Sequence, residues 1–320
     1  MSVTSSEIRL GVDLGGTKIE IIALDPTGKE LIRQRVLTPQ GDYMGTVNAV
    51  AALVESTENS LGQKGSVGMG IPDAESLIDG CIKNANSTCL NGKPLRHDVQ
   101  ALLRRPIRIE NDANCLALSE AVDGAGSGAQ TVFAAILGTG VGGGIVLHGQ
   151  LLIGANRIAG EWGHNPLPML HEENLPPPTC YCGRQGCVET WLSGPALAAD
   201  HARHIGKTLD APNIALRAEQ GDRDCENTLQ RYERRLAKSL AQIINILDPQ
   251  IIVLGGGLSN LSRLYENVPR LWTSHVFSDE VRTRLCRSKH GDSSGVRGAA
   301  WLWNDANFRH TLRTPTSSGP

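Results

Sequence analysis

The sequence predicts an α/β protein whose two domains face each other across a cleft. One observation behind this prediction is a repeated plan: an apolar strand, a glycine-rich turn and a second strand follow one another at residues 9–24 and again at 131–148. The other is size, because 320 residues with 40% hydrophobic content are enough to bury about two separate cores. We therefore expect one such hairpin in each domain.

The elements expected in the N-terminal half are strands at 9–12, 19–24 and 29–37, a helix at 46–61, a strand at 66–71, a short helix, a strand at 107–109 and a helix at 115–122. The strands are short apolar runs bounded by glycine, proline and polar residues, whereas the long helix is amphipathic. Asparagine and aspartate at 111–114 suit the start of the last helix, because their side chains can cap free backbone N–H groups. The glycine-rich residues 124–128 would then carry the chain into the second domain.

The elements expected in the C-terminal half are a strand at 131–137, a glycine-rich turn at 138–144, a hairpin around Gly149 at 145–153, a long helix that Asp248-Pro249 ends, a strand at 251–254 and a last helix at 295–303. The long helix is predicted because its leucines and isoleucines fall on one face. We expect residues 1–122 and 290–303 to form a smaller N-terminal domain, and residues 123–289 a larger C-terminal domain. The polar tail at 304–320 is expected to be disordered.

Charge and composition exclude several classes of partner. The formal net charge is −2, which gives no electrostatic reason to expect nucleic acid, and the 4% aromatic content offers few platforms for stacking bases. No apolar run approaches the roughly 20 residues that span a bilayer, and the N-terminus has no basic segment followed by an apolar one. We therefore expect a cytoplasmic protein without a membrane partner.

The glycine-rich turns predict a site for a nucleotide triphosphate. Glycines adopt positive φ and leave backbone N–H groups uncovered, so two such tips can grip a phosphate chain from both sides of a cleft. A dinucleotide fingerprint at 138–143 is rejected, because a hairpin rather than a helix follows it. Gly206-Lys207-Thr208 resembles the end of a Walker A loop, but His201 stands where the first glycine belongs.

Asp13 follows the first strand and adjoins the first tip, where a carboxylate would hold Mg²⁺ next to the bound triphosphate. The alternative is a turn aspartate that caps its own backbone. Thr17 and Lys18 could add a hydroxyl and a charge, unless Lys18 simply faces solvent. Residues 255–257 either let the backbone approach an adenosine or only end a buried strand. The expected nucleotide-binding residues are Asp13, Gly15, Gly16, Thr17, Lys18, Gly138, Thr139, Gly140, Gly255, Gly256 and Gly257.

Asp112 is the candidate catalytic base. It stands at the carboxyl end of a predicted strand, where its carboxylate would point into the cleft in which an alcohol and a nucleotide meet. Accepting the proton of the attacking hydroxyl is the acid–base task that phosphoryl transfer leaves to a protein. The alternative is a plain helix N-cap.

Three cysteines and a histidine predict a structural zinc site. Of eight cysteines, Cys180, Cys182 and Cys187 crowd into one short segment, and His164 lies upstream. Three thiolates and an imidazole complete a closed tetrahedral shell, and such a cluster in a reducing compartment is more often a metal site than a disulfide. The metal would fix the loop that brings Glu161 and Glu189 to the cleft, where they could accept hydrogen bonds from sugar hydroxyls or remain surface acids.

Asparagines in turns at predicted strand ends are suited to reading hydroxyl groups, because an amide both donates and accepts. Asn84, Asn86 and Asn111 are the candidates, although asparagine is also a common turn former. Arg297, in the closing helix, is equally a candidate for a structural ion pair and for a nucleotide contact.

These motifs, in this order, resemble the ROK family of sugar kinases. The matching segments are GVDLGGTKIE at 11–20, GIP at 70–72, ENDAN at 110–114, GTGVGGG at 138–144, EWGH at 161–164, CYCGRQGCVE at 180–189 and LGGG at 254–257. The resemblance covers residues 8–303. It implies the two-domain actin/hexokinase-like (ribonuclease H-like) ATPase fold with an interdomain cleft, ATP and Mg²⁺ as cofactors, structural Zn²⁺ and a homodimer.

The resemblance also assigns roles. Asp112 matches the family's base, Asp13 and the glycine turns its ATP site, and His164 with Cys180, Cys182 and Cys187 its zinc site. The residues that would hold the sugar are Asn86, Asn111, Asp112, Glu161, His164 and Glu189. The implied reaction is ATP-dependent phosphorylation of the 6-hydroxyl of a hexose.

The substrate expected from this resemblance is fructose, with mannose or glucose as further substrates. Residues 83–88, 161–168 and 289–303 look most like the bacterial fructokinase/mannokinase branch, whereas 138–144 is shared with N-acetylglucosamine kinases. An N-acetylglucosamine or N-acetylmannosamine kinase is therefore the alternative. A sugar-responsive regulator is a further alternative, disfavoured because the first strand leaves no room for an N-terminal helix-turn-helix. Asp73 departs from the family's usual glycine after GIP and puts the sugar edge of the cleft in doubt.

Overall fold

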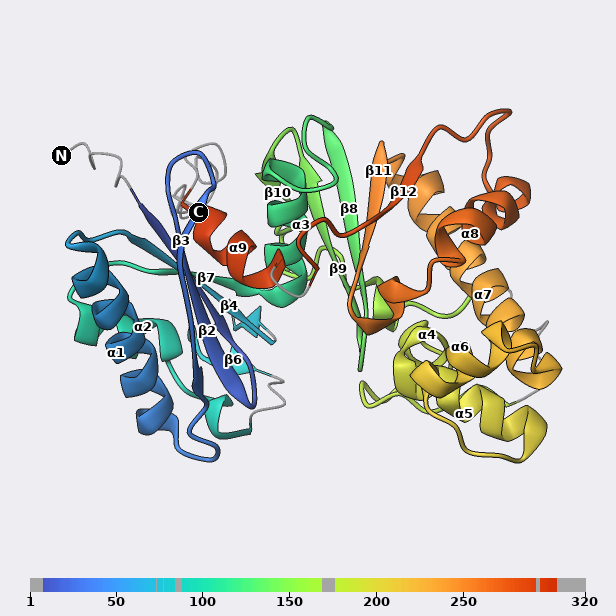
Figure 1. Ribbon diagram of the computed structural model, residues 1–320, viewed down its shortest axis with the longest axis horizontal. Coiled ribbons are helices and arrows are strands. Elements are labelled where there is room, and N and C mark those ends of the chain that lie inside the picture. The colour runs from blue at the N-terminus through green and yellow to red at the C-terminus, as the bar shows by residue number, and fades with distance from the viewer. Residues whose placement is uncertain are drawn as a thin grey trace, which may run out of the picture.

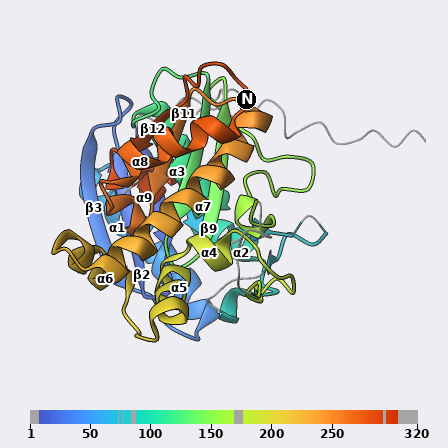
Figure 2. The same cartoon turned by 90° about the vertical axis from the view of Figure 1, so that its right-hand side faces the viewer.

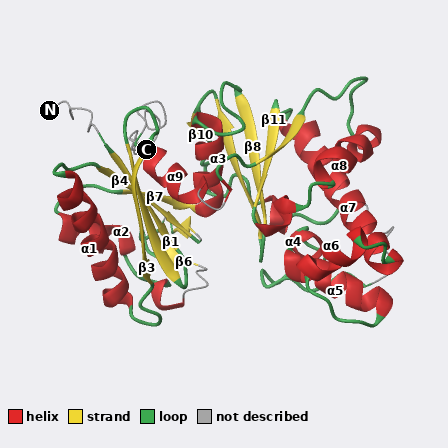
Figure 3. Cartoon of the chain, viewed as in Figure 1, coloured by secondary structure: helices red, strands yellow, loops and turns green. Residues whose placement is uncertain are grey.

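The computed structural model describes residues 8–72, 74–76, 78–83, 88–168, 176–291 and 294–303. Two five-stranded sheets stand side by side, with two helices between them and further helices on their outer faces (Figure 1). Figure 3 shows the same layers by secondary structure, and they alternate from helix to sheet to helix across the molecule. The repeated hairpin plan of the sequence thus corresponds to two separate sheets.

The N-terminal sheet has the strand order β3-β2-β1-β4-β7. Its strands are β1 (Arg9–Leu14), β2 (Lys18–Leu24), β3 (Glu30–Leu37), β4 (Ser66–Ile71) and β7 (Arg108–Asn111). The hairpin strands β1 and β2 are antiparallel, whereas β1, β4 and β7 are parallel. Helices α1 (Tyr43–Leu61) and α2 (Leu95–Leu103) cover the outer face, and α9 (Ser294–Trp301) packs on the inner face. Parallel pairing brings the carboxyl ends of β1, β4 and β7 to one edge.

The C-terminal sheet has the strand order β10-β9-β8-β11-β12. Its strands are β8 (Thr131–Leu137), β9 (Val141–Leu147), β10 (Gln150–Leu151), β11 (Ile251–Gly255) and β12 (Arg284–Arg287). The long helix α7 (Arg223–Leu247) and α8 (Leu264–Trp272) lie over its outer face (Figure 2). Helix α3 (Asp112–Val122) packs on the inner face, against β8 and β9. The arrangement therefore repeats that of the N-terminal sheet.

Shorter elements connect these layers. They are β5 (Ala74–Glu75), β6 (Ile82–Lys83), η1 (Thr88–Leu90), η2 (Trp162–His164), α4 (Glu189–Leu192), α5 (Gly194–Ile205), α6 (Ala211–Glu219), η4 (Gly257–Asn260) and η5 (Thr273–His275). Among the residues that the structure describes, no helix is both long and apolar enough to cross a lipid bilayer.

Glycines let the inner helices approach the sheets and each other closely. A Cβ atom on Gly298 of α9 would lie 1.7 Å from the carbonyl oxygen of Cys115 in α3, and one on Gly144 of β9 would lie 2.5 Å from the carbonyl oxygen of Ala113. Real Cβ atoms do not approach other atoms so closely, so side chains are excluded at these positions. We call the contact surface of α3, α9 and β9 the glycine seam.

Several expected boundaries were wrong by a few residues. The strand expected from 145 begins at Val141, so Gly142, Gly143 and Gly144 belong to β9 and not to the turn. The helix expected from 115 begins at Asp112, because Asn111 is its N-cap and its side chain accepts a hydrogen bond from the N–H of Asn114. The tail at 304–320 lies outside the described residues, and the domain boundaries at 122 and 290 stay predictions.

Candidate functional site

A cavity of about 390 Å³ brings together residues from both halves of the chain. Its lining includes Asp13 and the first glycine tip from the N-terminal sheet, Asp112 at the start of α3, and Gly256 after β11. The complete lining is Asp13, Leu14, Gly15, Gly16, Lys18, Pro72, Asp112, Leu116, Ile136, Gly256, Gly291 and Gly295. Five of the residues expected at a nucleotide site (Asp13, Gly15, Gly16, Lys18 and Gly256) thus surround the candidate base.

The two carboxylates of this cavity have perturbed pKa values. Burial, and then the charge of Asp112, raises the pKa of Asp13 to about 6. Burial also raises the pKa of Asp112 to about 6, and the charge of Glu161 adds to the shift. Asp112 borders solvent in the cleft, but the surrounding protein excludes enough water to disfavour its charged form. A carboxylate with this pKa is still ionised at neutral pH and is a stronger base than an ordinary aspartate.

The first tip is a tight turn held by its own backbone. The N–H of Gly15 donates to the carbonyl oxygen of Lys18 at 3.0 Å, and the hydroxyl of Thr38 donates to the carbonyl oxygen of Gly15 at 2.7 Å. Lys18 is half exposed and lies 3.9 Å from Glu20. Thr17 is not part of the described lining of this cavity but lines a second cavity of about 330 Å³. Gly16 lines both cavities, so the two meet at the first tip.

The second tip, Gly138 to Gly140, is not part of the described lining of the first cavity, to which its hairpin contributes Ile136. It instead adjoins Glu189, whose Oε2 accepts a hydrogen bond from the N–H of Val141 at 2.9 Å. A Cβ atom on Gly140 would lie 2.7 Å from the same oxygen. The structure thus places the second tip, with the exposed Thr139, beside a residue expected to bind sugar.

The three glycines at the end of β11 differ in their surroundings. Gly256 has a φ of +79° and lines the cavity, and a Cβ atom there would lie 2.6 Å from the carbonyl oxygen of Leu137. Gly255 ends β11 against Leu116, and Gly257 begins η4 outside the described lining. Arg297 pairs with Asp123 and donates to the carbonyl oxygen of Gly28 at 2.7 Å, as the ion-pair alternative predicts.

Two of the expected sugar residues lie near Asp112. Asn111 precedes Asp112, and its Oδ1 accepts a hydrogen bond from the N–H of Asn114 at 2.7 Å. The side-chain NH₂ group of Asn111 is then the part that can donate to a sugar hydroxyl. Glu161 is exposed, immediately before η2, and its charge acts on Asp112. Asn84 and Asn86, together with Asp73, lie outside the described residues.

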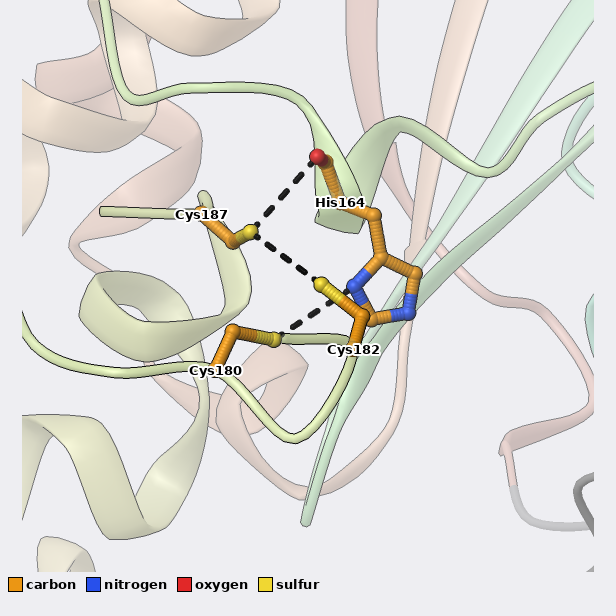
Figure 4. Close-up of side chains that lie close together, drawn as sticks. All are labelled: His164, Cys180, Cys182 and Cys187. Atoms are coloured by element: carbon orange, nitrogen blue, oxygen red, sulfur yellow. Dashed lines mark hydrogen bonds between the residues drawn. The ribbon is translucent and has the colours of Figure 1, made fainter. Parts of the chain in front are cut away.

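The four expected metal ligands form one cluster (Figure 4). One ligand atom from each of His164, Cys180, Cys182 and Cys187 lies within 4.8 Å of all the others. Sγ of Cys180 is 3.6 Å from Nδ1 of His164, and Sγ of Cys182 is 3.7 Å from Sγ of Cys187. Tetrahedral zinc with Zn–S bonds of about 2.3 Å and Zn–N bonds of about 2.0 Å separates its ligands by roughly 3.5 to 3.8 Å. The donor set and its spacing therefore fit zinc.

Tyr181 contacts the histidine of this cluster and was missed by the sequence reasoning. Its hydroxyl lies 3.0 Å from Nε2 of His164, and the two rings meet edge to face with centroids 5.1 Å apart. When Nε2 carries the proton and donates it to the Tyr181 hydroxyl, Nδ1 keeps its lone pair for a metal. Both ring nitrogens of His164 thus have neighbours, so a sugar hydroxyl that used Nε2 would replace Tyr181.

Glu110 and Arg157 form an ion pair that was also missed. Arg157, in the segment after β10, places Nη2 3.2 Å from Oε1 of Glu110 at the end of β7, so the pair joins the two sheets beside Asn111. Asn114 donates to the other oxygen of Glu110 at 3.1 Å. The sequence carries no signal for this pair, because arginine at 157 stands in an irregular segment with a φ of +54°.

Comparisons with known proteins agree over almost the whole chain. The sequence pattern of the ROK family matches residues 9–306. An N-acetyl-D-glucosamine kinase from Salmonella newport (strain SL254) is 41% identical over 296 residues, which are 91% of this chain and 98% of that relative. A solved ROK hexokinase from Thermus thermophilus has a TM-score of 0.82 at 30% identity and covers 92% of this chain and 96% of its own. A ROK family glucokinase from Streptomyces griseus, in complex with glucose and AMPPNP, has a TM-score of 0.74 at 28% identity, with coverage of 92% and 98%.

Fold and site together define an α/β protein with the two-domain actin/hexokinase-like ATPase fold, related to sugar kinases over nearly its whole length. The match at residues 9–306 then places it plainly: this chain belongs to the ROK family. The resemblance drawn from the sequence motifs is confirmed. The relatives named above are N-acetylglucosamine kinases, hexokinases and glucokinases, and they give no support to the expected preference for fructose.

Proposed function

We propose that this protein transfers the γ-phosphoryl group of ATP to the 6-hydroxyl of a hexose. The observation that carries the proposal is the cavity in which Asp112 lies together with Asp13, the first glycine tip and Gly256. In this reaction the hexose oxygen forms a bond to the γ-phosphorus while the bond from that phosphorus to the β-bridging oxygen breaks. The products are hexose 6-phosphate and ADP.

Asp112 is the proposed proton acceptor. It would take the proton of the 6-hydroxyl as this oxygen approaches the phosphorus, and its raised pKa makes it a better base while leaving it ionised at neutral pH. Asp13 and the N–H group of Gly16 would hold the magnesium complex of the phosphates. Magnesium would supply charge neutralisation on the phosphate oxygens, and a carboxylate is the ligand it prefers.

Asn111, Glu161, His164 and Glu189 are the proposed sugar ligands, together with Asn86 from outside the described residues. Support comes from their arrangement. Asn111 precedes Asp112, the charge of Glu161 raises the pKa of Asp112, and Glu189 adjoins the second tip. The cluster of His164 and three cysteines is the proposed structural zinc site. A metal there would fix the segment between η2 and α4, and with it Glu161 and Glu189, which flank the four ligands in the sequence.

The acceptor we propose first is N-acetylglucosamine, because relatives at 41% identity over nearly the whole chain carry that activity in their names. Fructose is the second candidate, favoured by the segments at 83–88, 161–168 and 289–303. Coupled ADP release with ATP and N-acetylglucosamine, N-acetylmannosamine, fructose, mannose or glucose separates them by kcat/KM. Absence of ADP release with every sugar would contradict the proposal.

Substitution of Asp112 tests the proposed base. Asp112→Asn keeps the size of the side chain and removes its basicity, so kcat should fall by about 100-fold or more. Near-normal turnover in a variant with an unchanged melting temperature would remove Asp112 from this role.

We also propose that the domains divide near residues 122 and 290 and that the protein is a homodimer. Limited proteolysis tests the domain boundaries, and sedimentation tests the oligomeric state.

A further inference from the structure

Glu120 is a buried carboxylate at the junction between the two halves of the molecule. It lies near the carboxyl end of α3 and has an exposed fraction of 0%. Two segments meet around it: the one that leads from α3 to β8, and the one that leads from β12 to α9. The first segment lies between β7 of the N-terminal sheet and β8 of the C-terminal sheet, and the second leads from β12 of the C-terminal sheet to α9, which packs on the N-terminal sheet.

The carboxylate is fully engaged by donors from both segments. Oε1 accepts hydrogen bonds from the hydroxyls of Ser288 and Ser294, each at 2.8 Å. Oε2 accepts from the backbone N–H groups of Ala125 at 2.7 Å and Lys289 at 3.1 Å. Burial alone would raise the pKa of Glu120, but these hydrogen bonds hold it below its ordinary value, so the group is a carboxylate anion.

The glycine-rich crossing is shaped around the same side chain. A Cβ atom on Gly124 would lie 2.3 Å from Oε2 of Glu120, so any other residue would displace the carboxylate. Ser288 and Ser294 are about 170 residues from Glu120 in the sequence, and Gly124 has no side chain. The reaction proposed above uses none of the three. Their common feature is that they enclose one anion.

This anion is linked to the candidate nucleotide cavity through two serine hydroxyls, and one of these serines, Ser294, directly precedes Gly295 in the chain. Oγ of Ser288 contacts Glu120 and also accepts a hydrogen bond from the N–H of Gly291 at 3.1 Å. Gly291 has a φ of +56°, which suits glycine, and it lines the cavity together with Gly295. The part of the cavity wall formed by Gly291 and Gly295 is therefore fastened to α3 through Glu120.

We propose that Glu120 is a positioning residue for nucleotide binding, which it serves by holding the wall formed by Gly291 and Gly295 at a fixed place relative to α3. The inference rests on the proposed function, because it takes this cavity as the nucleotide site. The same helix carries Asp112 at its first position and Glu120 in its last turns. Helix α3 thus positions both the base and this part of the wall, which would fix the phosphates relative to the base.

Ser288→Ala is the most specific test, since it removes the hydroxyl that joins Glu120 to Gly291 and leaves in place the carboxylate and its hydrogen bond from Ser294. We expect its KM for ATP to rise about tenfold, the worth of one hydrogen bond to a charged group, while the KM for the sugar stays within about twofold. Glu120→Ala should raise the KM for ATP further. Glu120→Gln should restore part of it, because an amide can still accept from Ala125 and Lys289 and donate to the serine hydroxyls.

A matched control separates positioning from a merely structural role. Asp200 is another buried carboxylate, 1% exposed, which accepts from Nε of Arg231 at 2.9 Å on the outer helices of the C-terminal half. Asp200→Asn should lower the melting temperature, as Glu120→Ala does, without changing the KM for ATP. Equal KM values for ATP in Ser288→Ala and the wild type, or an equal rise in Asp200→Asn, would overturn the inference.

Calorimetric titration with a non-hydrolysable ATP analogue completes the test and distinguishes its failure from that of the proposed function. Wild-type protein that binds no analogue would contradict the nucleotide site itself and the inference with it. Wild-type binding with unaltered affinity in Ser288→Ala and Glu120→Ala would overturn the inference alone. Weaker analogue binding in both variants, with unchanged sugar affinity, is the result we expect.

Discussion

Lowering the pH tests the proposed roles of Asp13 and Asp112, the two carboxylates that line the candidate nucleotide cavity. Asp13 and Asp112 both have pKa values of about 6, in each case chiefly because burial disfavours the charged form. The proposed roles require both groups to be ionised, Asp13 beside the magnesium complex of the phosphates and Asp112 as proton acceptor. Lowering the pH through 6 should therefore remove activity in a way that depends on both residues.

The size of the effect follows from these pKa values. At pH 5 a group with a pKa near 6 is ionised in roughly one molecule in ten, so two required groups leave roughly one molecule in a hundred competent. A plot of log kcat/KM against pH should approach a slope of two below about pH 5.5, whereas a single required group gives a slope of one and about a tenfold loss. The free enzyme is the relevant state for kcat/KM.

The assay is initial-rate ADP release from pH 5 to 8, with circular dichroism at each pH to verify the fold. In Asp13→Asn the residual activity should follow a slope of one, since a single titrating group remains. A flat profile between pH 5 and 7 in folded wild-type protein would refute the reasoning, and so would a slope of two that survives in Asp13→Asn.

The same shift predicts a stability change of definite sign. A carboxyl group whose pKa is raised by folding contributes stability below its unfolded pKa, and this contribution is lost as the pH rises through about 6. At pH 7.5 Asp13→Asn should therefore increase the free energy of unfolding, by about 1 kcal/mol once solvent screening of the partly exposed group is allowed for. Urea titrations at pH 7.5 and 5 measure it, and the gain should shrink at the lower pH.

Three further predictions concern other parts of the molecule. Cys182→Ser should release bound zinc, measured by atomic emission, and lower the melting temperature, because a structural metal contributes its binding energy to folding; full zinc content would contradict the site. Gly298→Ala should destabilise the fold by about 3 kcal/mol or more in urea, since its Cβ would strike the carbonyl oxygen of Cys115. Arg157→Ala should lower the free energy of unfolding by about 1 kcal/mol or less, as expected for a partly exposed ion pair with Glu110, and should raise the KM for the sugar. An unchanged KM would show that this ion pair has no role in sugar binding.

Local patterns predicted the strands, the long helices and the two hairpins, because each depends on neighbours in the sequence. They failed at residues 142–144, where three glycines indicated a turn. At Gly144 helix α3, which precedes it by about thirty residues, packs at a distance that only glycine permits, and at Gly143 the carbonyl oxygen of Gly160 is similarly close. A contact between distant elements thus decided the local structure.

The same reason explains which site residues were missed. Asp13, Asp112 and the metal cluster belong to short motifs whose chemistry is visible in sequence, and the structure gathers Asp13 with Asp112 and the four metal ligands with one another. Glu120 looks like an ordinary exposed glutamate at the end of a helix. Its burial arises from serines about 170 residues away, which no window of sequence can anticipate.

The glycine seam has a consequence for attempts to re-engineer this protein. Strand β9 and helices α3 and α9 meet backbone to backbone, so their mutual placement leaves no slack that a larger or smaller side chain could absorb. Random mutagenesis should therefore yield mostly insoluble clones at these positions, whichever substrate is selected for. Libraries that aim at a new acceptor sugar are better confined to single proposed sugar ligands such as Glu161, which is exposed and lies outside both the seam and the metal cluster.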